Sequence, residues 1–398
     1  MKVLRSVKKW FSEAFVVFRC EFDLVRRDAG VIIFFFGLPL LYPIVYTLIY
    51  NTETVRDLPI AVVDHCRTSD SRELTRHAEA TSAMHIYSQC SNLGEARNLM
   101  AEGKVYGILE IPHDYADKIG RGETAHADFY CDMSLLLRYR AFLTAFTEVQ
   151  LSTGTEITQI KMAAAGKDAG GMPIDTRSHF MGDPEEGYAS FILPAIIILI
   201  LHQSMLLGVS MVGATSRERK RYYNGHDPLR PECYGLCATV WGRTMVYFLC
   251  YVPMTIYILH WIPEIFSLPH YGSPSVYLLF IVPFLLATAL LGQTLAYFIR
   301  EREMAFLVFV FSSVVFIFLS GMIWPRFAMA AGWRIVGDFI PAVWGVEGFA
   351  LINNNAATLP DVATPYYWLW GLVVLYFVAA VGVTAYLRKR PLRKFRPY

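Results

Sequence analysis

An uncharged apolar run from residue 30 to residue 50 is the feature that most restricts the folds available to this chain. A helix of this length crosses the hydrocarbon core of a bilayer, about 30 Å thick, and the run lacks the small-residue cleavage site of a signal peptide. Five further apolar runs of similar length follow it. The sequence therefore predicts an α-helical integral membrane protein with six transmembrane helices, at residues 29–50, 188–213, 236–262, 276–299, 304–323 and 366–387.

Lysine and arginine residues are divided unevenly among the connecting segments. They are frequent before residue 29, in the connection 214–235 and in the basic tail 388–398, and they are rare in 263–275 and 324–365. Because cytoplasmic loops carry the excess of positive charge, we expect both termini in the cytoplasm and the protein in the cell (inner) membrane. The chain has no strongly basic nucleic-acid footprint, so no nucleic-acid partner is expected.

Residues 1–28 combine an aromatic stripe with basic residues. Trp10, Phe11, Phe15 and Phe18 recur near helical spacing, and lysines and arginines lie between them and on either side. Helices of this kind lie at a membrane surface. The segment is therefore predicted to be an amphipathic interfacial helix that binds the lipid bilayer.

Residues 51–187 differ from the rest of the chain because they hold most of the acidic residues. Strands alternate with helices there, which predicts an inserted extracytoplasmic α/β domain around one sheet. We expect strands at 59–64, 84–88, 105–111 and 127–130, and helices at 69–80, 93–102, 115–119 and 135–164. Cys66, Cys90 and Cys131 fall in this domain, and the sequence leaves open whether two of them form a disulfide.

Motifs for enzyme chemistry are absent from the sequence. There is no GxxxxGK[ST] loop, no GxGxxG after a strand, no HExxH and no GxSxG. We therefore expect no catalytic site, no cofactor and no metal in this chain. The predicted spans also contain no Asp or Glu, which counts against a secondary transporter, because such a carrier needs a site for its coupling ion.

Three polar side chains, His202, Gln203 and Gln293, lie inside the predicted spans. Contact with substrate along a transport path is one role open to them. For His202 and Gln203, hydrogen bonding between helices is the favoured role.

Two local patterns are more specific. After the second span, the run Arg217-Glu218-Arg219-Lys220-Arg221 includes an acid that a simple positive-charge anchor does not need, which suggests an exposed segment that docks on another protein.

The second pattern lies near the fifth span and consists of Ser320, Gly321, Trp324 and Pro325, then Pro341, Glu347 and Gly348. Because the stretch is too interrupted to cross a bilayer, residues 324–350 are predicted to form outer re-entrant helices with an aromatic belt.

These motifs resemble those of the type-2 ABC export permeases. In that family a Ser-Gly-x-x-[Phe/Trp]-Pro pattern closes the fifth span, as at 320–325, and an outer segment with Pro and Glu-Gly follows, as at 341–348. The run 217–219 resembles the family's ATPase-binding loop, although RYYNGHDPLRP replaces the usual Gly-Thr and Leu-rich continuation. The motifs VVD at 62–64 and GILEIP at 107–112 resemble a subgroup with a large domain between the first two spans.

The resemblance implies the permease subunit of an ABC exporter. The apolar, aromatic-rich spans suit a lipid or an amphipathic, drug-like substrate, although the sequence does not identify it. Separate ABC ATPase subunits would bind ATP and Mg, a second permease (identical or homologous) would complete the pathway, and a periplasmic adaptor could dock outside. It implies ATPase coupling through Arg217, Glu218, Arg219, Lys220 and Arg221, and an outer gate at Ser320, Gly321, Trp324, Pro325, Pro341 and Glu347. The main alternative is a membrane-anchored sensor or receptor that uses the α/β domain, for which one or two spans would suffice.

Overall fold

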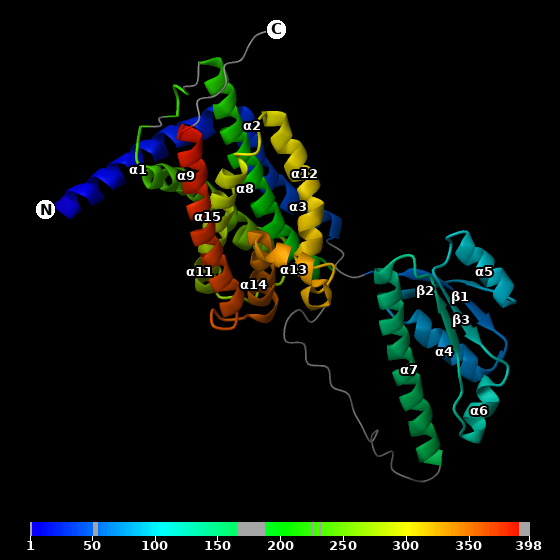
Figure 1. Cartoon of the computed structure of the whole chain (residues 1–398). Coiled ribbons are helices and arrows are strands. Elements are labelled where there is room, and N and C mark those ends of the chain that lie inside the picture. The colour runs from blue at the N-terminus through cyan, green and yellow to red at the C-terminus, as the bar shows by residue number, and fades with distance from the viewer. Residues whose placement is uncertain (1, 51–54, 165–187, 224–226, 231–232, 390–398) are drawn as a thin grey trace, which may run out of the picture. The chain divides into compact units, whose positions relative to one another are not determined.

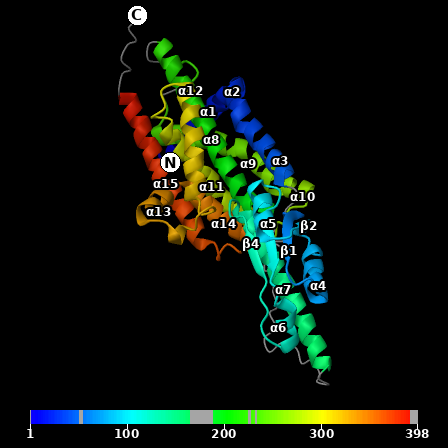
Figure 2. The same ribbon diagram turned by 90° about the vertical axis from the view of Figure 1, so that its right-hand side faces the viewer.

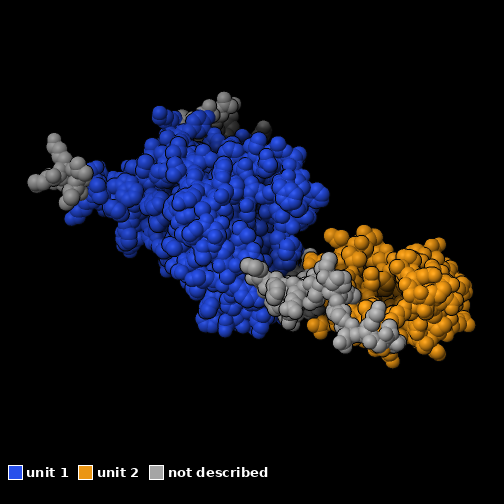
Figure 3. Space-filling view, turned by 90° about the horizontal axis from the view of Figure 1, so that it is seen from below, with its two compact units in different colours: residues 1–53, 180–398 blue, residues 54–179 orange. Residues whose placement is uncertain are grey.

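The computed structural model describes residues 2–50, 55–164, 188–223, 227–230 and 233–389. The chain forms two compact units, residues 1–53 with 180–398, and residues 54–179 (Figure 3). The first is a helical unit and the second is an α/β unit, and each has its own hydrophobic core.

The helical unit is built around α8, the long central helix in Figure 1. In the most apolar stretch of α8, 78% of the residues are buried, against 17% in α12 and 22% in α15, so the latter two helices lie at its periphery. The helical elements of the unit are α1 (Lys2–Arg27), α2 (Ala29–Ile32), α3 (Leu38–Tyr50), α8 (Tyr188–Tyr222), α9 (Leu236–Ile256), α10 (Ile262–Phe266), α11 (Pro274–Leu295), α12 (Arg302–Leu319), α13 (Ala331–Asp338), α14 (Pro341–Asn355) and α15 (Ala363–Lys389). Short π-helical turns, η1 (Ile33–Gly37) and η2 (Tyr257–Trp261), join α2 to α3 and α9 to α10, and the 3-10 turn η3 (Arg326–Ala328) precedes α13.

Among the described residues, six helices or helix runs are long and apolar enough to cross a membrane: Ala29–Tyr50, Ser190–Tyr222, Leu236–Phe266, Pro274–Leu295, Arg302–Leu319 and Ala363–Lys389. The pair α13 and α14 meets the same criterion only if it is taken together, and it is bent by 88°. A bend of this size fits the re-entrant helices predicted for this part of the chain, whose depth in the membrane stays a prediction. A mostly helical membrane fold is confirmed.

Several predicted boundaries differ from the observed ones. The connection predicted at 214–235 begins as helix, because α8 continues to Tyr222. The fourth span ends early, at Leu295, and the third continues through η2 to Phe266. The fifth span ends at Leu319 because Gly321, two residues on, has a φ of +87°, a left-handed conformation that ends helices and favours glycine. Residues 165–187 and 390–398 lie outside the described residues.

A close contact joins α1 to α9 at Gly242. A Cβ atom on Gly242 would lie 2.5 Å from the Ala14 carbonyl oxygen and 3.0 Å from the Val17 Cβ. Only a glycine lets α1 approach α9 this closely. In Figure 1, α1 lies across the end of the bundle where α8 and α15 end and α12 begins.

The α/β unit contains one four-stranded sheet with the order β2-β1-β3-β4. β1 pairs in parallel with β2 and β3, and β4 is antiparallel to β3. Its elements are β1 (Leu58–Asp64), α4 (Ser69–Glu79), β2 (Met84–Gln89), α5 (Leu93–Ala101), β3 (Gly107–Ile111), α6 (Tyr115–Arg121), β4 (Asp128–Cys131) and α7 (Leu136–Ala164). Every predicted strand and helix of this unit is present, with ends that differ by no more than two residues.

Burial on both faces explains why β1 is apolar along almost its whole length. Ile60 and Val62 belong to the same cluster as residues of α4 and α7, whereas Ala61 and Val63 pack in a second cluster with α5. The cysteines of this unit, Cys66, Cys90 and Cys131, are all free thiols, so the structure contains no disulfide among them.

Candidate transport pathway and coupling site

A buried ion cluster holds α1 against the bundle. Glu21 on α1 is only 1% exposed, and it accepts hydrogen bonds from Arg230 Nη2 at 2.6 Å and Arg230 Nε at 3.0 Å. Arg243 on α9 lies 3.6 Å from the same carboxylate, and the Tyr247 hydroxyl donates to it. Burial alone would raise the pKa of Glu21, but the two arginines and the tyrosine hydroxyl hold it below its ordinary value.

A second buried carboxylate folds the segment 227–230 onto the end of α8. Asp227 is fully buried and accepts hydrogen bonds from Arg219 Nε at 3.1 Å, Arg219 Nη2 at 3.2 Å and the Ser216 hydroxyl at 2.5 Å. The backbone N–H of Leu229 donates to it at 3.1 Å. Burial alone would raise the pKa of Asp227, but the hydrogen bonds from these donors lower it by more. The pKa of Asp227 is therefore below its ordinary value. Arg219 is therefore engaged within its own chain.

A charged node, formed by Asp28, Glu218 and Arg302, joins three helix ends. The backbone N–H of Arg302, at the start of α12, donates to Glu218 Oε1 on α8 at 3.0 Å. The Arg302 guanidinium pairs with Asp28, which also caps α2 by accepting from the N–H groups of Gly30 and Val31 at 3.1 and 3.2 Å. The first span, α8 and α12 are thus connected at one point.

Arg217 likewise contacts its own chain. Its Nη1 donates to the Ile299 carbonyl at 2.6 Å, and its guanidinium lies 5.3 Å from the ring centre of Tyr297. Lys220 and Arg221, in the last turn of α8, are half-buried. The first three residues of the predicted coupling run, 217–219, therefore make contacts within the bundle. These contacts explain why α8 continues through them.

An apolar groove lies between α3, α8 and α12, which are neighbours in the bundle (Figure 2). Its volume is about 350 Å³, within the range of small-molecule sites. Most of its lining is aliphatic or aromatic, and the lining residues with polar atoms are Tyr42, Tyr46, Gln203, Ser204 and Ser313. The Gln203 amide nitrogen and oxygen are buried and have no hydrogen-bond partner in the described part of the chain.

The three predicted intramembrane polar residues have different surroundings. Gln293 on α11 donates to the Thr244 hydroxyl on α9 at 2.7 Å, a hydrogen bond between helices. His202 is fully buried beside the rings of Phe284 and Phe316, and neither of its ring nitrogens has a partner among the described residues. In the described part of the chain, neither His202 nor Gln203 makes the interhelical hydrogen bond that was favoured for it, and His202 instead packs against aromatic rings.

An arginine organises the outer segment around the predicted gate. Arg326 pairs with Glu347 at 2.5 Å and with Asp338, and its guanidinium lies 4.2 Å from the ring centre of Trp344. Trp344 stacks on Trp368 of α15, with 5.1 Å between ring centres. Arg326, which the sequence motifs did not single out, therefore holds η3, α13 and α14 together.

The remaining predicted gate residues lie at the ends of these elements. Ser320 and Gly321 form the turn after α12, and a Cβ on Gly321 would lie 2.9 Å from the Arg326 Cγ. Pro341 opens α14, where the absence of an N–H is tolerated. Trp324 is 57% exposed.

We expect Arg326→Gln to lower the free energy of unfolding by about 1–3 kcal/mol, because it removes the cation shared by two carboxylates. Thermal unfolding of the detergent-purified protein checks this. Arg334→Gln on exposed α13 is the matched control and should change stability little. Equal effects of the two substitutions would contradict the role given to Arg326.

Comparison with protein-family models matches residues 29–381 to the family described as ABC-2 family transporter protein. The chain belongs to the ABC-2 transporter family. The resemblance to ABC export permeases is thereby confirmed at the level of the family. No curated protein sequence matches the chain. As an ABC-2 protein it is a multi-pass membrane protein and a non-catalytic permease component, and membership implies association with ABC ATPase subunits.

The residues that organise this ABC-2 permease and were missed by the sequence reasoning include Asp28, Asp227 and Arg302, as well as Glu21 and Arg326. Asp28 immediately precedes the first span, a position at which an acid can cap a helix, and this was a usable signal. Asp227 lies in the stretch that departs from the family pattern. No local signal links Arg302 to partners far away in the sequence.

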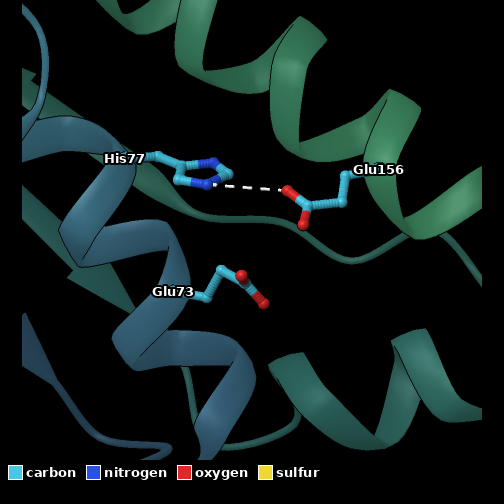
Figure 4. Close-up of side chains that lie close together, drawn as sticks. All are labelled: Glu73, His77 and Glu156. Carbon is cyan, nitrogen blue, oxygen red and sulfur yellow. Dashed lines mark ion pairs between the residues drawn. The ribbon is translucent and has the colours of Figure 1, made fainter. Parts of the chain in front are cut away.

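The α/β unit of the permease contains a group that could hold a metal ion: Glu73, His77 and Glu156, on α4 and α7 (Figure 4). His77 Nε2 lies 3.5 Å from Glu156, and Nδ1 lies 3.0 Å from the Thr153 hydroxyl. Glu73 is already paired with Arg76 at 2.8 Å. These contacts join α4 to α7 as ordinary polar interactions, and nothing else in the described residues points to a metal here.

Proposed function

We propose that this protein is the permease of an ABC exporter that moves hydrophobic or amphipathic substrates, lipid-like or drug-like, out of the cytoplasm or the inner leaflet. The observation that carries the proposal is the groove between α3, α8 and α12. Its volume suits such a molecule, its walls are apolar, and the buried Gln203 amide offers a donor and an acceptor. An amphipathic substrate would satisfy both.

The orientation follows from the distribution of positive charge. Lys and Arg are concentrated before the first span, after α8 and after α15, which supports cytoplasmic termini in the cell (inner) membrane. In this orientation the charged node faces the cytoplasm, and the α/β unit and the segment around Arg326 are extracytoplasmic. The outer gate would then be formed by the turn at Gly321 with α13 and α14.

The coupling to ATP hydrolysis is proposed to pass through the charged node. The node joins the cytoplasmic ends of the same three spans that line the groove. An ATPase subunit, with its own ATP and Mg, that moves the end of α8 would therefore shift α12 and the first span together. Lys220 and Arg221, with the exposed Tyr222 and Tyr223 that follow, are the surface proposed to contact it. Such a movement alters the groove only if the ATPase binds one arrangement better than the other.

The assembly would contain two permeases and two ATPase subunits. The second permease would be either a copy of this chain or a homologue, and α12 and α15 offer exposed apolar side chains, such as Phe311, Val314 and Val378, on which it could pack. A periplasmic adaptor would bind the α/β unit, where substrate leaves.

The test is recovery of the complex from its native membrane, followed by ATP-dependent transport of a fluorescent short-chain phospholipid in proteoliposomes. We expect an ABC ATPase to copurify. Glu218→Gln should keep the ATPase bound but lower transport about tenfold, since a charged hydrogen bond at a helix end contributes about 1.5–3 kcal/mol.

Glu303→Gln is the control, because it removes the same charge from the exposed first turn of α12 without touching the node. A complex without an ATPase would overturn the exporter, and recovery of a kinase or regulator instead would favour the sensor. If both substitutions lowered transport equally, the node would have no special role.

A further inference from the structure

A small pocket with a basic lining, here called the basic pocket, lies between the cytoplasmic ends of α8, α9, α11 and α15. Its volume is about 70 Å³. A cavity of this size holds on the order of five water-sized atoms, enough for the four oxygens of a phosphate group. Its cationic lining residues are Arg217, Lys220, Arg230, Arg243 and Arg388. Among the described residues that line it, none is an Asp or a Glu.

The cationic lining residues differ in their partners. Glu21 pairs with Arg230 and Arg243 from outside the lining. Arg217 and Arg388, in contrast, donate hydrogen bonds to uncharged oxygens, namely two backbone carbonyls and the Thr239 hydroxyl. Several like charges around one small cavity repel one another, and an anion inside it relieves that repulsion.

The Arg388 side chain has an N–H donor at the basic pocket for which the described residues offer no acceptor. Its Nη1 donates to the Tyr234 carbonyl at 2.6 Å, and its Nη2 donates to the Thr239 hydroxyl at 3.0 Å. These two bonds fix the guanidinium at the pocket. Its Nε is buried and has no hydrogen-bond partner in the part of the chain that is described. A buried guanidinium N–H normally finds an acceptor.

The lining of the basic pocket also contains apolar side chains, including Val209, Val383 and Leu387. A cavity that is lined by both cations and aliphatic side chains, at the level where spans leave the membrane, suits a phosphate at the bilayer surface. Basic pockets between helices on the cytoplasmic side are typical sites for anionic headgroups.

We propose that the basic pocket binds a phosphate group, supplied by the headgroup of an anionic phospholipid or by free phosphate. The site is distinct from the groove, and it does not depend on the transported substrate. Arg388 and Lys220 contribute charge from α15 and α8, so that the bound anion joins the ends of these two helices. Removing either cation should weaken binding.

The experiment follows the thermal unfolding of the detergent-purified permease while phosphatidylglycerol, phosphatidylcholine or inorganic phosphate is titrated at constant ionic strength. We expect a saturable rise in unfolding temperature with at least one anion and none with phosphatidylcholine. Arg388→Gln should weaken the apparent affinity at least tenfold, and Arg388→Lys should restore much of it. Arg334→Gln is the control substitution, since it removes an exposed arginine from the other end of the unit.

The anion arms distinguish the source: a response to phosphatidylglycerol alone identifies a lipid site, and a response to inorganic phosphate identifies a free-anion site. Lys220→Gln gives a second reading if Arg388→Gln does not fold. The proposal is overturned if neither anion stabilises the wild-type protein saturably, or if Arg388→Gln and Lys220→Gln respond as strongly as the control.

Discussion

Replacing Glu21 with alanine is expected to lower the free energy of unfolding by about 3–5 kcal/mol, the cost of leaving buried charges without their partner. Arg230 and Arg243 have side chains that are only 11% and 13% exposed, and both face the Glu21 carboxylate. Without it, two guanidinium groups remain in a poorly hydrated site. Denaturant unfolding in mixed micelles measures the loss.

The matched control for this prediction is Asp23→Ala, two residues along the same helix. Asp23 pairs with Arg26, but these side chains are 50% and 66% exposed, so the expected cost is about 0–1 kcal/mol. A cost for Glu21→Ala as small as that of the control would mean that the cluster does not hold α1.

The same carboxylate gives the stability a pH dependence with a defined sign. Burial raises the pKa of Glu21, and the neighbouring cations more than reverse that effect, so its pKa is depressed in the folded protein. Its contribution is therefore complete above the unfolded pKa of about 4.5 and is lost as the pH falls further, through the folded value. The loss below pH 4.5 should be smaller in Glu21→Gln than in the wild type.

Gly242→Ala is expected to destabilise the protein by about 1–3 kcal/mol, although alanine is the better helix former. The added Cβ would lie 2.5 Å from a backbone oxygen of α1, and a backbone atom cannot swing aside as a side chain does. The helix α1 must therefore move away from α9. The measurement is again the free energy of unfolding.

Gly371→Ala on α15 provides the opposite expectation. No atom lies within 4 Å of the position that its Cβ would take, so the substitution should be neutral or stabilise the helix by up to about 1 kcal/mol. Two substitutions of the same kind in membrane helices thus have opposite predicted signs. A stabilising Gly242→Ala would show that α1 does not pack against α9 as described.

The sequence predicted the elements of this protein well because their signals are local. In the α/β unit, the alternation of apolar runs and turn residues placed β1 and α4 within one residue of their observed ends. The candidate spans were recognised from the length of their uncharged apolar runs alone. Their ends were less accurate, since α8 continues past the apolar run through residues whose partners lie elsewhere.

The candidate sites were only partly predictable, because their contacts link distant segments. Glu21 and Arg230 are 209 residues apart, and Arg302 and Asp28 are 274 apart. The basic run after the second span was recognisable, but its internal partners were not. The stretch that departs from the family pattern supplies both Asp227 and Arg230, so the family resemblance gave no guide to their contacts.

The order of synthesis determines when the charged node can form. Asp28 and Glu218 precede Arg302 in the chain, and the residue that joins them is therefore synthesised last. Until α12 emerges, Asp28 lacks its guanidinium partner and Glu218 lacks its backbone N–H donor, because Arg302 supplies both groups. Insertion of the fifth span thus completes a contact that the first two spans cannot make alone.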